Sequence, residues 1–559
     1  MIRRLFHREL DHYPGAARRS GYLALVVLTT VVLYYQQYVG GSVSPSVLAH
    51  FQMSFRFYLS VIVVSNAFGA LASLVAGLAD RWGRANIALW GLLAASLTTA
   101  LGIPNATSRV GYAAMVSVVG FVEGLVLVAT PALVRDFSPQ LGRGRAMGFW
   151  TLGPVLGSLT VSEVASNTLP HLHPWQDQFH IAGVVGLAVF VVAFPALREL
   201  SAGLRDQLMV STKERALLEA RARGIDVRAA LARPWRQMLG PRVLVSSLGV
   251  GVFLLIYYAA VGFFVIYFTS VFGFSQAQAN GLGNWFWAAD AVTVVVVGLV
   301  SDAVGVRKPF VVAGTLAAVV MTAIFATRAT HPDTSYDTFV VLISVLSASR
   351  GFAYAPWMAA FTETLERRNP ALVATGLAVW GWVLRVVVAV SFLVIPAVVT
   401  SASPVVDFGP RLQAITAAYP AQVRTLRQID PATLAALRAD RSDHAAIARA
   451  LAEIEAKAGV PPAQAVSRLV ALSRVPQADR AYLAAHGHQV LAARAAAPAQ
   501  WRRWWWVCVG GEVAFLPTVA LLAGRWRRSA ARRDREAHQA AVEAELARLA
   551  EPAPAVVGT

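Results

Sequence analysis

Long apolar segments recur along this sequence of 559 residues, and they constrain its fold more than any other feature. An α-helix needs about 20 apolar residues to cross a bilayer. Twelve segments reach about this length: 21–40, 57–79, 86–103, 111–134, 146–165, 179–197, 243–270, 284–301, 309–327, 337–360, 372–399 and 503–524. Hydrophobic residues make up 56% of the chain and charged residues only 14%, whereas a soluble surface needs about 25%. We therefore expect an all-α membrane protein with twelve transmembrane helices, rather than a soluble enzyme.

Basic residues indicate how these helices cross the membrane. The chain carries a net charge of +18, and its Arg residues gather before the first segment, in alternate loops and after the last segment. The short loops on the opposite side hold only Arg56, Arg109 and Arg328. Because basic loops remain in the cytoplasm, we predict two cytoplasmic termini in a bacterial inner membrane, with the first segment retained as a helix. The positive charge then reports orientation, and no nucleic-acid partner is expected.

The spacing of the segments divides the chain into seven regions. We expect a cytoplasmic N-terminal segment, a six-helix bundle, a cytoplasmic linker, helices 7–11, an extracytoplasmic helical insert, helix 12 and a basic cytoplasmic tail. These regions are 1–20, 21–197, 198–242, 243–399, 400–502, 503–524 and 525–559. The insert is interpreted either as a packing lid or as a docking module for a partner or substrate. Trp501 and Trp504–Trp506 follow it and suggest an aromatic belt at the membrane interface.

The two six-helix halves repeat one another at an offset of 222 to 228 residues. Leu33-Tyr34-Tyr35 in the first helix has Ile256-Tyr257-Tyr258 in the seventh, and Pro131 in the fourth has Pro356 in the tenth. Gly148 and Gly153 in the fifth helix have Gly376 and Gly381 in the eleventh. Two parallel repeats are typical of an alternating-access transporter with its site between the halves.

The loop after the second helix is the most specific motif. Gly77-Leu78-Ala79-Asp80-Arg81-Trp82-Gly83-Arg84 resembles the signature loop of the major facilitator superfamily, and Gly298–Gly305 is its weaker copy, with Asp302 and Gly305 in place. Ala76 and Ala303 depart from the family pattern. The resemblance implies the twelve-helix fold in two pseudo-symmetric bundles. It also implies a gating role for Asp80, Arg81, Gly83, Arg84, Asp302 and Gly305, in which Arg81 and Arg84 pair with facing carboxylates.

The fifth helix carries a second motif of this superfamily. Gly148, Gly153, Pro154 and Gly157 resemble the pattern of its proton antiporter branch. Small residues let helices approach closely in lipid, and a proline can bend the helix, so a flexible seam is expected here. In the fourth helix, however, Gly120 stands where that branch commonly has Arg, which speaks against a drug antiporter.

Five ionisable residues lie near the middle of apolar segments: Glu123, Asp290, Arg350, Arg385 and Glu512. Such residues are costly in lipid and usually mark a functional cavity. Glu123 is the first candidate proton carrier, with Asp290 and Glu512 as further candidates. We expect Glu123 to face Arg350 and Glu512 to face Arg385, as functional or static pairs. The resemblance implies that helices 1, 4, 7 and 10 line the cavity. With Arg385 of helix 11 added as the second membrane arginine, the candidate substrate-binding residues are Tyr34, Tyr35, Gln36, Gln37, Tyr257, Tyr258, Arg350 and Arg385.

No motif for other chemistry is present. The sequence has no phosphate-binding loop, no zinc-protease motif and no serine elbow, and its single cysteine is Cys508, so we expect no cofactor, no metal and no enzyme activity. We predict a monomeric secondary transporter of a small organic solute, coupled to protons and exporting by antiport. The alternatives are a proton symporter that takes up an organic anion, and a non-transporting membrane scaffold or sensor that uses the insert.

Overall fold

We analysed a computed structural model that describes residues 8–74, 82–137, 152–201 and 234–524, except 329, 332, 370–372 and 441, and short pieces between 526 and 540. The chain forms two compact units. One unit contains Met1–Val399 and Pro498–Thr559, and we call it the membrane unit. The other contains Thr400–Ala497, and we call it the insert unit.

The first half of the membrane unit, here the N half, is a helical bundle with a short sheet at one end. Its helices are α2 (Ala16–Ser42), α3 (Ser44–His50), α4 (Phe55–Leu74), α6 (Arg84–Leu97), the π-helical turn η1 (Thr98–Gly102), α7 (Arg109–Phe137), α9 (Gly153–Thr168) and α10 (Trp175–Ala196). Strand β1 (Glu9–Leu10) pairs in parallel with β2 (Glu199–Leu200). A continuous apolar core that includes Val26, Leu89 and Leu133 joins α2, α6 and α7.

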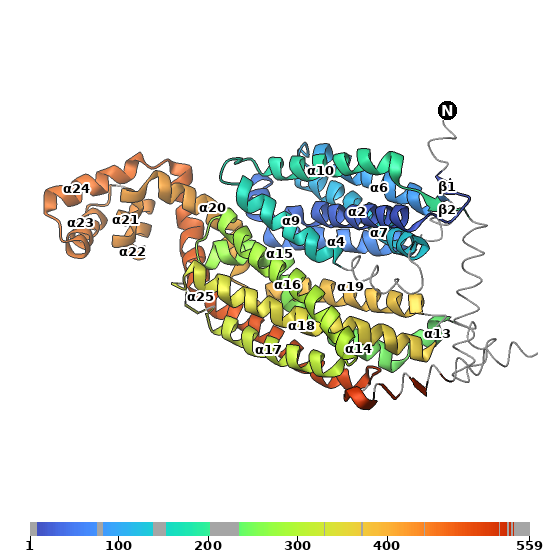
Figure 1. Cartoon of the computed structure of the whole chain (residues 1–559). Coiled ribbons are helices and arrows are strands. Elements are labelled where there is room, and N and C mark those ends of the chain that lie inside the picture. Colours follow the sequence, from blue (N-terminus) through green and yellow to red (C-terminus); the bar gives the residue numbers. More distant parts are fainter. Residues whose placement is uncertain are drawn as a thin grey trace, which may run out of the picture. The chain divides into compact units, whose positions relative to one another are not determined.

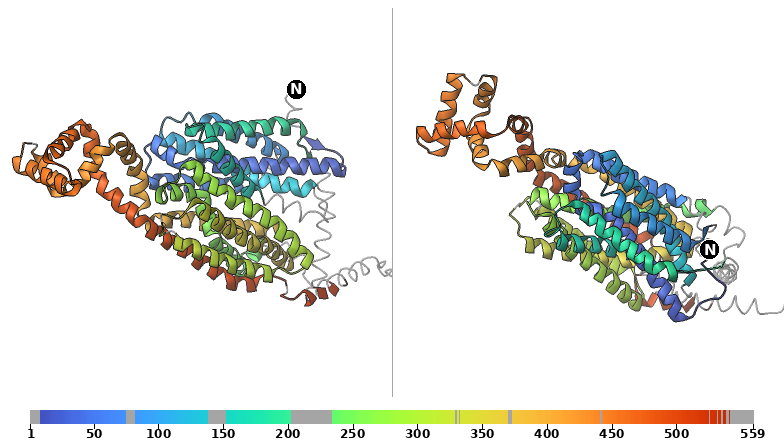
Figure 2. Two further views of the ribbon diagram at one scale, coloured as in Figure 1. Left: turned by 60° about the vertical axis from the view of Figure 1, so that its left-hand side comes forward. Right: turned by 90° about the horizontal axis from the view of Figure 1, so that it is seen from above.

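The second half of the membrane unit, here the C half, is a similar bundle. Its elements are α13 (Pro234–Met238), α14 (Pro241–Phe253), α15 (Leu255–Val271), α16 (Gln276–Val304), α17 (Lys308–Arg328), α18 (Tyr336–Arg368), α19 (Val373–Val398), the last part of α25 (Gln477–Phe515) and the 3-10 helix η5 (Leu516–Leu521). A second core, around Trp357, Phe361 and Phe515, joins α18 to η5 and α14. Figures 1 and 2 show the two halves as two groups of long helices lying side by side.

Eleven helices among the described residues are long and apolar enough to cross a membrane. The predicted segment 146–165 is described only from residue 152, and α9 covers its second part with 16 residues. Large apolar side chains are exposed along these helices, for example Val191, Val292 and Leu393, each exposed by more than 60%. Such surfaces suit lipid and not water, and the chain is a multi-pass membrane protein.

The insert unit is a small helical bundle with its own core. It contains α20 (Ala402–Ala418), α21 (Pro420–Gln428), α22 (Pro431–Ala439), α23 (His444–Ala458), α24 (Pro462–Ala471), the 3-10 turn η4 (Leu472–Arg474) and the first part of α25. Ile429, Ala450, Ile454 and Ala465 are buried together. Gly459 ends α23 with φ +62°, a left-handed conformation that glycine adopts at little cost.

The tryptophans near the start of helix 12 correct one expectation. Trp501, Trp504 and Trp505 are buried, and only Trp506 is exposed as an interfacial aromatic belt requires. Trp501 and Trp505 pack against Tyr267 of α15 with ring centroids 5.1 Å apart in each case. The belt interpretation is wrong for three of the four residues because α25 continues across this region as one helix, and its aromatic face fills the C half.

Candidate functional site

The membrane unit has two ends, which we name by the chain segments that meet there. The linker end is where α10 ends and α14 begins, and the insert end is where α19 ends and α25 enters the unit. Four of the five ionisable residues singled out in the apolar segments lie near the middle of their helices, namely Glu123 in α7, Asp290 in α16, Arg350 in α18 and Arg385 in α19. The fifth, Glu512, lies near the end of α25, before η5.

A small-residue face of α9 positions the first tyrosine of the site. A Cβ atom added to Gly157 would lie 2.5 Å from Cβ of Tyr34, and one added to Gly153 would lie 2.7 Å from Cγ2 of Thr30. No larger residue fits at either position without moving α2. The helix 5 motif therefore holds α2 and α9 in close contact and fixes the place of Tyr34.

Tyrosines from both halves meet around the centre of the membrane unit. Tyr34 lies within electrostatic range of Glu123, Arg385 and Tyr354. Tyr38 lies within range of Tyr34, Tyr257, Tyr258 and Glu123. Because α2, α7, α15, α18 and α19 all contribute, this group spans the interface between the halves. We call it the central cluster: Tyr34, Tyr38, Glu123, Tyr257, Tyr258, Tyr354 and Arg385.

Glu123 of α7 has its counter-charge in the other half. Arg385 of α19 is the only charged residue with which it interacts among the described contacts. Both side chains are half-buried. An attraction between the two halves therefore passes through one carboxylate and one guanidinium.

The remaining charged candidates form a second group inside the C half. Arg350 of α18 interacts electrostatically with Glu512 of α25 and Asp290 of α16. All three are buried, with exposed fractions of 3%, 0% and 7%. Glu512 accepts a hydrogen bond of 2.9 Å from Thr322 through Oε1, while its Oε2 and Nη1 of Arg350 have no partner in the described part of the chain. Unsatisfied buried polar atoms are rare, and they mark places where water, a proton or a ligand group can bind. We call these three residues the C-half triad.

These groupings differ from the expected pairs. Glu123 lies with Arg385 rather than Arg350, and Glu512 lies with Arg350 rather than Arg385. The repeat places Glu123 and Arg350 at similar depth in α7 and α18, but depth alone does not decide which way a helix face points. The structure therefore exchanges the two expected pairs.

The three predicted binding residues that follow Tyr34 are not members of the central cluster. Tyr35 is 1% exposed and has no charged neighbour in the central cluster. Gln36 is buried and donates from Nε2 to Oγ of Ser96 at 2.9 Å and to the carbonyl of Ala182 at 3.3 Å. Gln36 therefore ties α2 to α6 and α10, away from the cluster. Gln37 is half-buried, and no hydrogen bond is described for it.

Two residues of the central cluster were missed by the sequence analysis. Tyr38 follows Tyr34 by one helical turn, with ring centroids 5.5 Å apart. Tyr354 follows Arg350 by one helical turn and interacts with both Tyr34 and Tyr258. Since residues at i and i+4 share a helix face, this spacing was the signal that could have found them.

The linker end of the N half is held by Arg84. Its Nη1 contacts both carboxylate oxygens of Asp136 at 2.8 and 3.0 Å, which joins the start of α6 to the end of α7. Its backbone N–H donates to Oε2 of Glu199 at 2.8 Å. Gly83 precedes it with φ +88°, and a Cβ atom there would lie 2.2 Å from Oε1 of Glu199. Glycine is therefore required at 83 by both its conformation and its surroundings.

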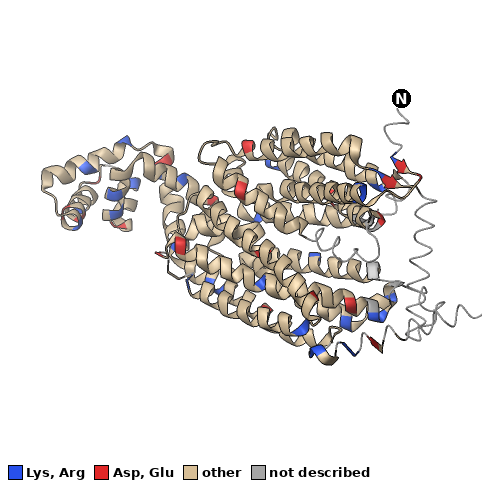
Figure 3. Cartoon of the chain, viewed as in Figure 1, with Lys and Arg blue, Asp and Glu red and all other residues tan. Residues whose placement is uncertain are grey.

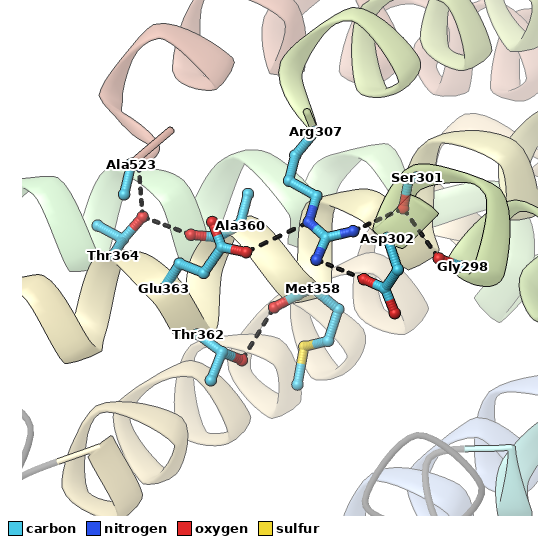
Figure 4. A network of polar contacts seen from close by, with 10 residues as sticks. All are labelled: Gly298, Ser301, Asp302, Arg307, Met358, Ala360, Thr362, Glu363, Thr364 and Ala523. Carbon is cyan, nitrogen blue, oxygen red and sulfur yellow. Dashed lines mark hydrogen bonds and ion pairs between the residues drawn. The ribbon is translucent and has the colours of Figure 1, made fainter. Parts of the chain in front are cut away.

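The linker end of the C half has a corresponding network around Arg307 (Figure 4). Arg307 pairs with Asp302 at the end of α16 and with Glu363 of α18, at 2.5 and 3.3 Å, and donates to Oγ of Ser301 at 2.8 Å. Gly305 ends α16 with φ +78°. The sequence comparison of the two loops did not single out Arg307, because Val306 stands at the position equivalent to Arg84. The other members of the predicted motifs, Asp80, Arg81 and Gly148, lie outside the described residues.

The insert end is where hydrogen bonds between the halves are described. Three amides spaced four residues apart on α16 reach across to the N half. Gln276 donates to Oγ of Ser46 at 2.7 Å, Asn280 to the carbonyl of Ser42 at 3.0 Å, and Asn284 to Oγ of Ser166 at 2.9 Å. We call these the amide ladder. It closes the insert end, while the Arg84 and Arg307 networks each join helices of one half.

A small pocket lies beside the amide ladder, between the halves. Its lining includes Tyr38, Ser158, Ser162, Asn280 and Trp287, and its volume is about 380 Å³ including the part open to solvent. Ser158 is buried, and its hydroxyl has no partner in the described part of the chain. The described residues contain no group of His, Cys, Asp and Glu side chains that could hold a metal ion.

Two membrane bundles with a polar cluster between them define a multi-pass protein of the two-bundle transporter class. The Major Facilitator Superfamily profile matches residues 26–392, and the chain belongs to this superfamily. Its members are transporters and not enzymes. No curated protein matches the sequence.

Solved structures of the same fold confirm the architecture. A bacterial homologue of the human lysosomal transporter Spinster, inward-facing and unoccupied, is 15% identical, with a TM-score of 0.55 over 92% of this chain and 100% of that chain. The xylose transporter XylE from E. coli, partially occluded and inward open, is 13% identical, with a TM-score of 0.52 over 68% of this chain and 92% of that chain. At these identities the likeness concerns the fold, and it confirms the predicted all-α superfamily architecture.

Proposed function

We propose that the protein is a secondary active transporter of a small organic solute that works by alternating access and is driven by protons. It acts as a monomer in a bacterial inner membrane with both termini in the cytoplasm, and it exports the solute by antiport. The main support for this proposal is the central cluster, where one carboxylate of the N half faces one guanidinium of the C half across the interface.

This arrangement links protonation to conformation. Protonation of Glu123 removes its attraction to Arg385, which is one of the interactions between the halves. A ligand or proton shifts a conformational equilibrium only if it binds one state better than the other. Because the two partners belong to different halves, rocking of the halves changes the distance between them, and protonation favours one state.

Contacts of α9 favour antiport. Its Gly157 packs on Tyr34 in the N half, and its Ser162 lies 2.5 Å from where a Cβ atom of Gly283 in α16 would be. Helix α9 thus lies against α2 of its own half through the helix 5 motif, and against α16 of the other half through Ser162. A seam of small residues lets these helices slide or bend without opening a wide leak.

A symporter for an organic anion is the second candidate. It is favoured by Arg350, whose Nη1 is buried without a partner in the described part of the chain. A guanidinium can bind a carboxylate through two parallel hydrogen bonds. Tyr258 and Tyr354, which interact electrostatically with one another beside Arg350, would supply hydroxyl groups next to such an anion.

Transport in proteoliposomes tests the proposal. Radiolabelled organic acids, sugars and amphipathic cations are first screened by counterflow, which needs no ion gradient. A solute that exchanges is then offered to liposomes with a pH gradient. Accumulation into acid-loaded liposomes indicates antiport and accumulation into alkaline-loaded liposomes indicates symport, whichever way the protein is inserted.

The Glu123→Gln variant tests the coupling. We expect it to retain counterflow and to lose accumulation driven by the pH gradient, and Glu163→Gln, at an exposed position of α9, to retain both. If Glu123→Gln accumulates solute as wild type does, Glu123 is not the proton carrier. If no solute in the screen exchanges and the insert unit captures a partner instead, the protein is a scaffold or sensor.

A further inference from the structure

A second pocket lies at the linker end of the C half, away from the central cluster. It is lined by Arg242, Arg367, Arg368, Thr364 and the segment Ala520–Gly524. Its volume is about 1050 Å³, including the part open to solvent. None of these residues takes part in the proposed transport site.

Three arginines from two helices converge on this pocket. Arg242 is the second residue of α14, and Arg367 and Arg368 lie in the last turn of α18. The guanidinium of Arg368 lies over Gly240, since a Cβ atom there would be 2.6 Å from both Nη1 and Nη2. The end of α18 is thereby held next to the start of α14.

These arginines have no acidic partner in the part of the chain that the structure describes. No hydrogen bond or ion pair of their side chains is described, and all three are exposed. Arg307, at the same end of the C half, pairs with both Asp302 and Glu363. The pocket therefore holds three positive charges, whereas the neighbouring network is balanced by carboxylates.

The opposite wall of the pocket is fixed by hydrogen bonds. Lys308 is 7% exposed, and its Nζ donates to the carbonyl of Ala520 at 3.3 Å. The backbone N–H of Ala523 donates to Oγ1 of Thr364 at 2.7 Å. These bonds hold the Ala520–Gly524 segment against α17 and α18, so the pocket is a formed feature of the fold.

The position of the pocket matches the headgroup layer of a bilayer. The membrane spans Pro241–Val271, Tyr336–Leu365 and Gln477–Leu521 all have one end at this pocket. Trp235, Leu239 and Trp526 nearby in the sequence are 53%, 49% and 52% exposed, and the Trp526 ring lies 5.6 Å from Nζ of Lys308. Tryptophan is typical of the membrane–water interface. Figure 3 shows several basic residues gathered at this end of the C half.

We propose that this pocket binds the headgroup of an anionic phospholipid. Phosphate oxygens match the planar donor array of a guanidinium, and basic pockets between membrane helices suit anionic headgroups. The exposed Trp and Leu side chains favour a lipid over a soluble phosphate, because they would contact its acyl region. A bound headgroup would bridge α14 and α18 of the C half.

Lipid titration of the purified full-length protein tests the proposal. Native mass spectrometry measures binding of phosphatidylglycerol, cardiolipin and phosphatidylcholine to wild type, to Arg367→Gln/Arg368→Gln and to Arg242→Gln. The control is Arg328→Gln, an exposed arginine at the other end of α17. We expect anionic lipid to bind in preference to phosphatidylcholine. Each arginine removed from the pocket should weaken it about fivefold, and the control should bind as wild type does.

Thermal unfolding in nanodiscs separates the possible occupants. Anionic lipid should raise the midpoint for wild type and not for the double variant, and added inorganic phosphate should have no such effect in phosphatidylcholine discs. If inorganic phosphate raises the midpoint equally, the site binds a soluble phosphate and the lipid proposal is overturned. If the double variant lowers the midpoint equally in every lipid, the arginines serve a contact within the chain, which also overturns it.

Discussion

At the linker end, Arg84 of the N half and Arg307 of the C half, which lies one residue beyond the equivalent position, pair with corresponding helices of the repeat. Arg84 pairs with Asp136 near the end of α7, and Arg307 pairs with Glu363 near the end of α18, the corresponding helix of the repeat. In the middle of the bundles the likeness ends. The N half contributes Glu123, whereas the C half contributes Asp290, Arg350 and Glu512 as well as Arg385.

The two halves differ in whether a buried carboxylate has its counter-charge in the same half or in the other half. The carboxylates of the C-half triad share an arginine of their own half, so their interaction persists when the halves move as rigid bodies. Glu123 depends on Arg385 of the other half, so its interaction changes with that motion. The two halves thus share an arginine network at the linker end and differ in the centre. On the proposed function, this difference makes the triad a stabilising group and the cross-half pair the coupling group.

Removal of the triad arginine should give the largest effect. Arg350→Ala leaves two carboxylates buried without a counter-charge, and breaking a buried charge interaction costs about 3–5 kcal/mol. We expect the free energy of unfolding to fall by about 3 kcal/mol or more. Arg385→Ala should cost less, because both members of its pair are half-buried. Unfolding of both variants in the same detergent measures the difference.

A second variant tests whether the stability lost in Arg350→Ala is due to the unpaired charges. Arg350→Met combined with Asp290→Asn and Glu512→Gln removes all three charges and should recover most of the lost stability. If the triple variant is no more stable than Arg350→Ala, the arginine acts through packing, for example on Phe253, whose ring lies 5.1 Å from its guanidinium carbon. Equal losses for Arg350→Ala and Arg385→Ala would contradict the contrast between the halves.

The two linker-end networks should differ by a smaller amount. Arg84 holds Asp136, whose side chain is only 8% exposed, while Arg307 holds Asp302, which is 60% exposed. Solvent weakens exposed ion pairs to below about 1 kcal/mol, whereas a shielded, charge-assisted contact contributes about 1.5–3 kcal/mol. We expect Arg84→Ala to destabilise more than Arg307→Ala. The thermal midpoints of both variants measure this, and the reverse order would show that the exposure of the paired carboxylate does not set the strength of these networks.

The fold could be predicted from the sequence because a lipid bilayer restricts which backbone structures can cross it. Apolar segments of about 20 residues must become helices, since backbone groups cannot remain unpaired in hydrocarbon. The repeat and the Gly77–Arg84 loop then indicated the superfamily, which the profile match confirms. Tyr34, Tyr257 and Tyr258 were singled out for the same reason, because the repeat relates them.

The pairing of the buried charges could not be predicted from the sequence, and the reason is again physical. Which carboxylate meets which arginine depends on the rotation of each helix about its own axis, and a largely apolar helix such as α18 gives little indication of its inner face. The amide ladder was missed because Gln276, Asn280 and Asn284 become recognisable as one face only when α16 lies against Ser42, Ser46 and Ser166. Contacts between halves also depend on the conformational state that the chain occupies.

The amide ladder provides the next test. It joins the two halves at the insert end, whereas the Arg84 and Arg307 networks lie at the linker end and each join helices of one half. Asn280→Ala removes one hydrogen bond between the halves, and one such bond contributes about 0.5–1.5 kcal/mol. We expect the open population at the insert end to rise about 2- to 10-fold. A reporter cysteine at Ser158, in the pocket beside the ladder, should react faster with a thiol reagent by that factor.

The chain offers good controls for this measurement. The native Cys508 is buried, so it should remain unlabelled in every variant. Asn105→Ala removes an exposed amide that bonds locally, to the carbonyl of Leu101 at 2.8 Å, and should leave the labelling rate unchanged. Equal rates for Asn280→Ala and the parent protein would show that the ladder does not hold the insert end closed.

A small effect is expected at Gly305, the glycine that ends α16, and its measurement completes the comparison of the two linker-end networks. Gly305→Ala places a Cβ atom on a residue with φ +78° and should cost about 1 kcal/mol. Gly83→Ala should cost more, because its Cβ atom also meets Glu199. Gly298→Ala, inside the same helix with open space around it, should stabilise by about 0.5–1 kcal/mol. The thermal midpoints of the three variants decide the order. A loss at Gly305 as large as at Gly83 would mean that backbone conformation alone, and not the Glu199 contact, requires glycine at both positions.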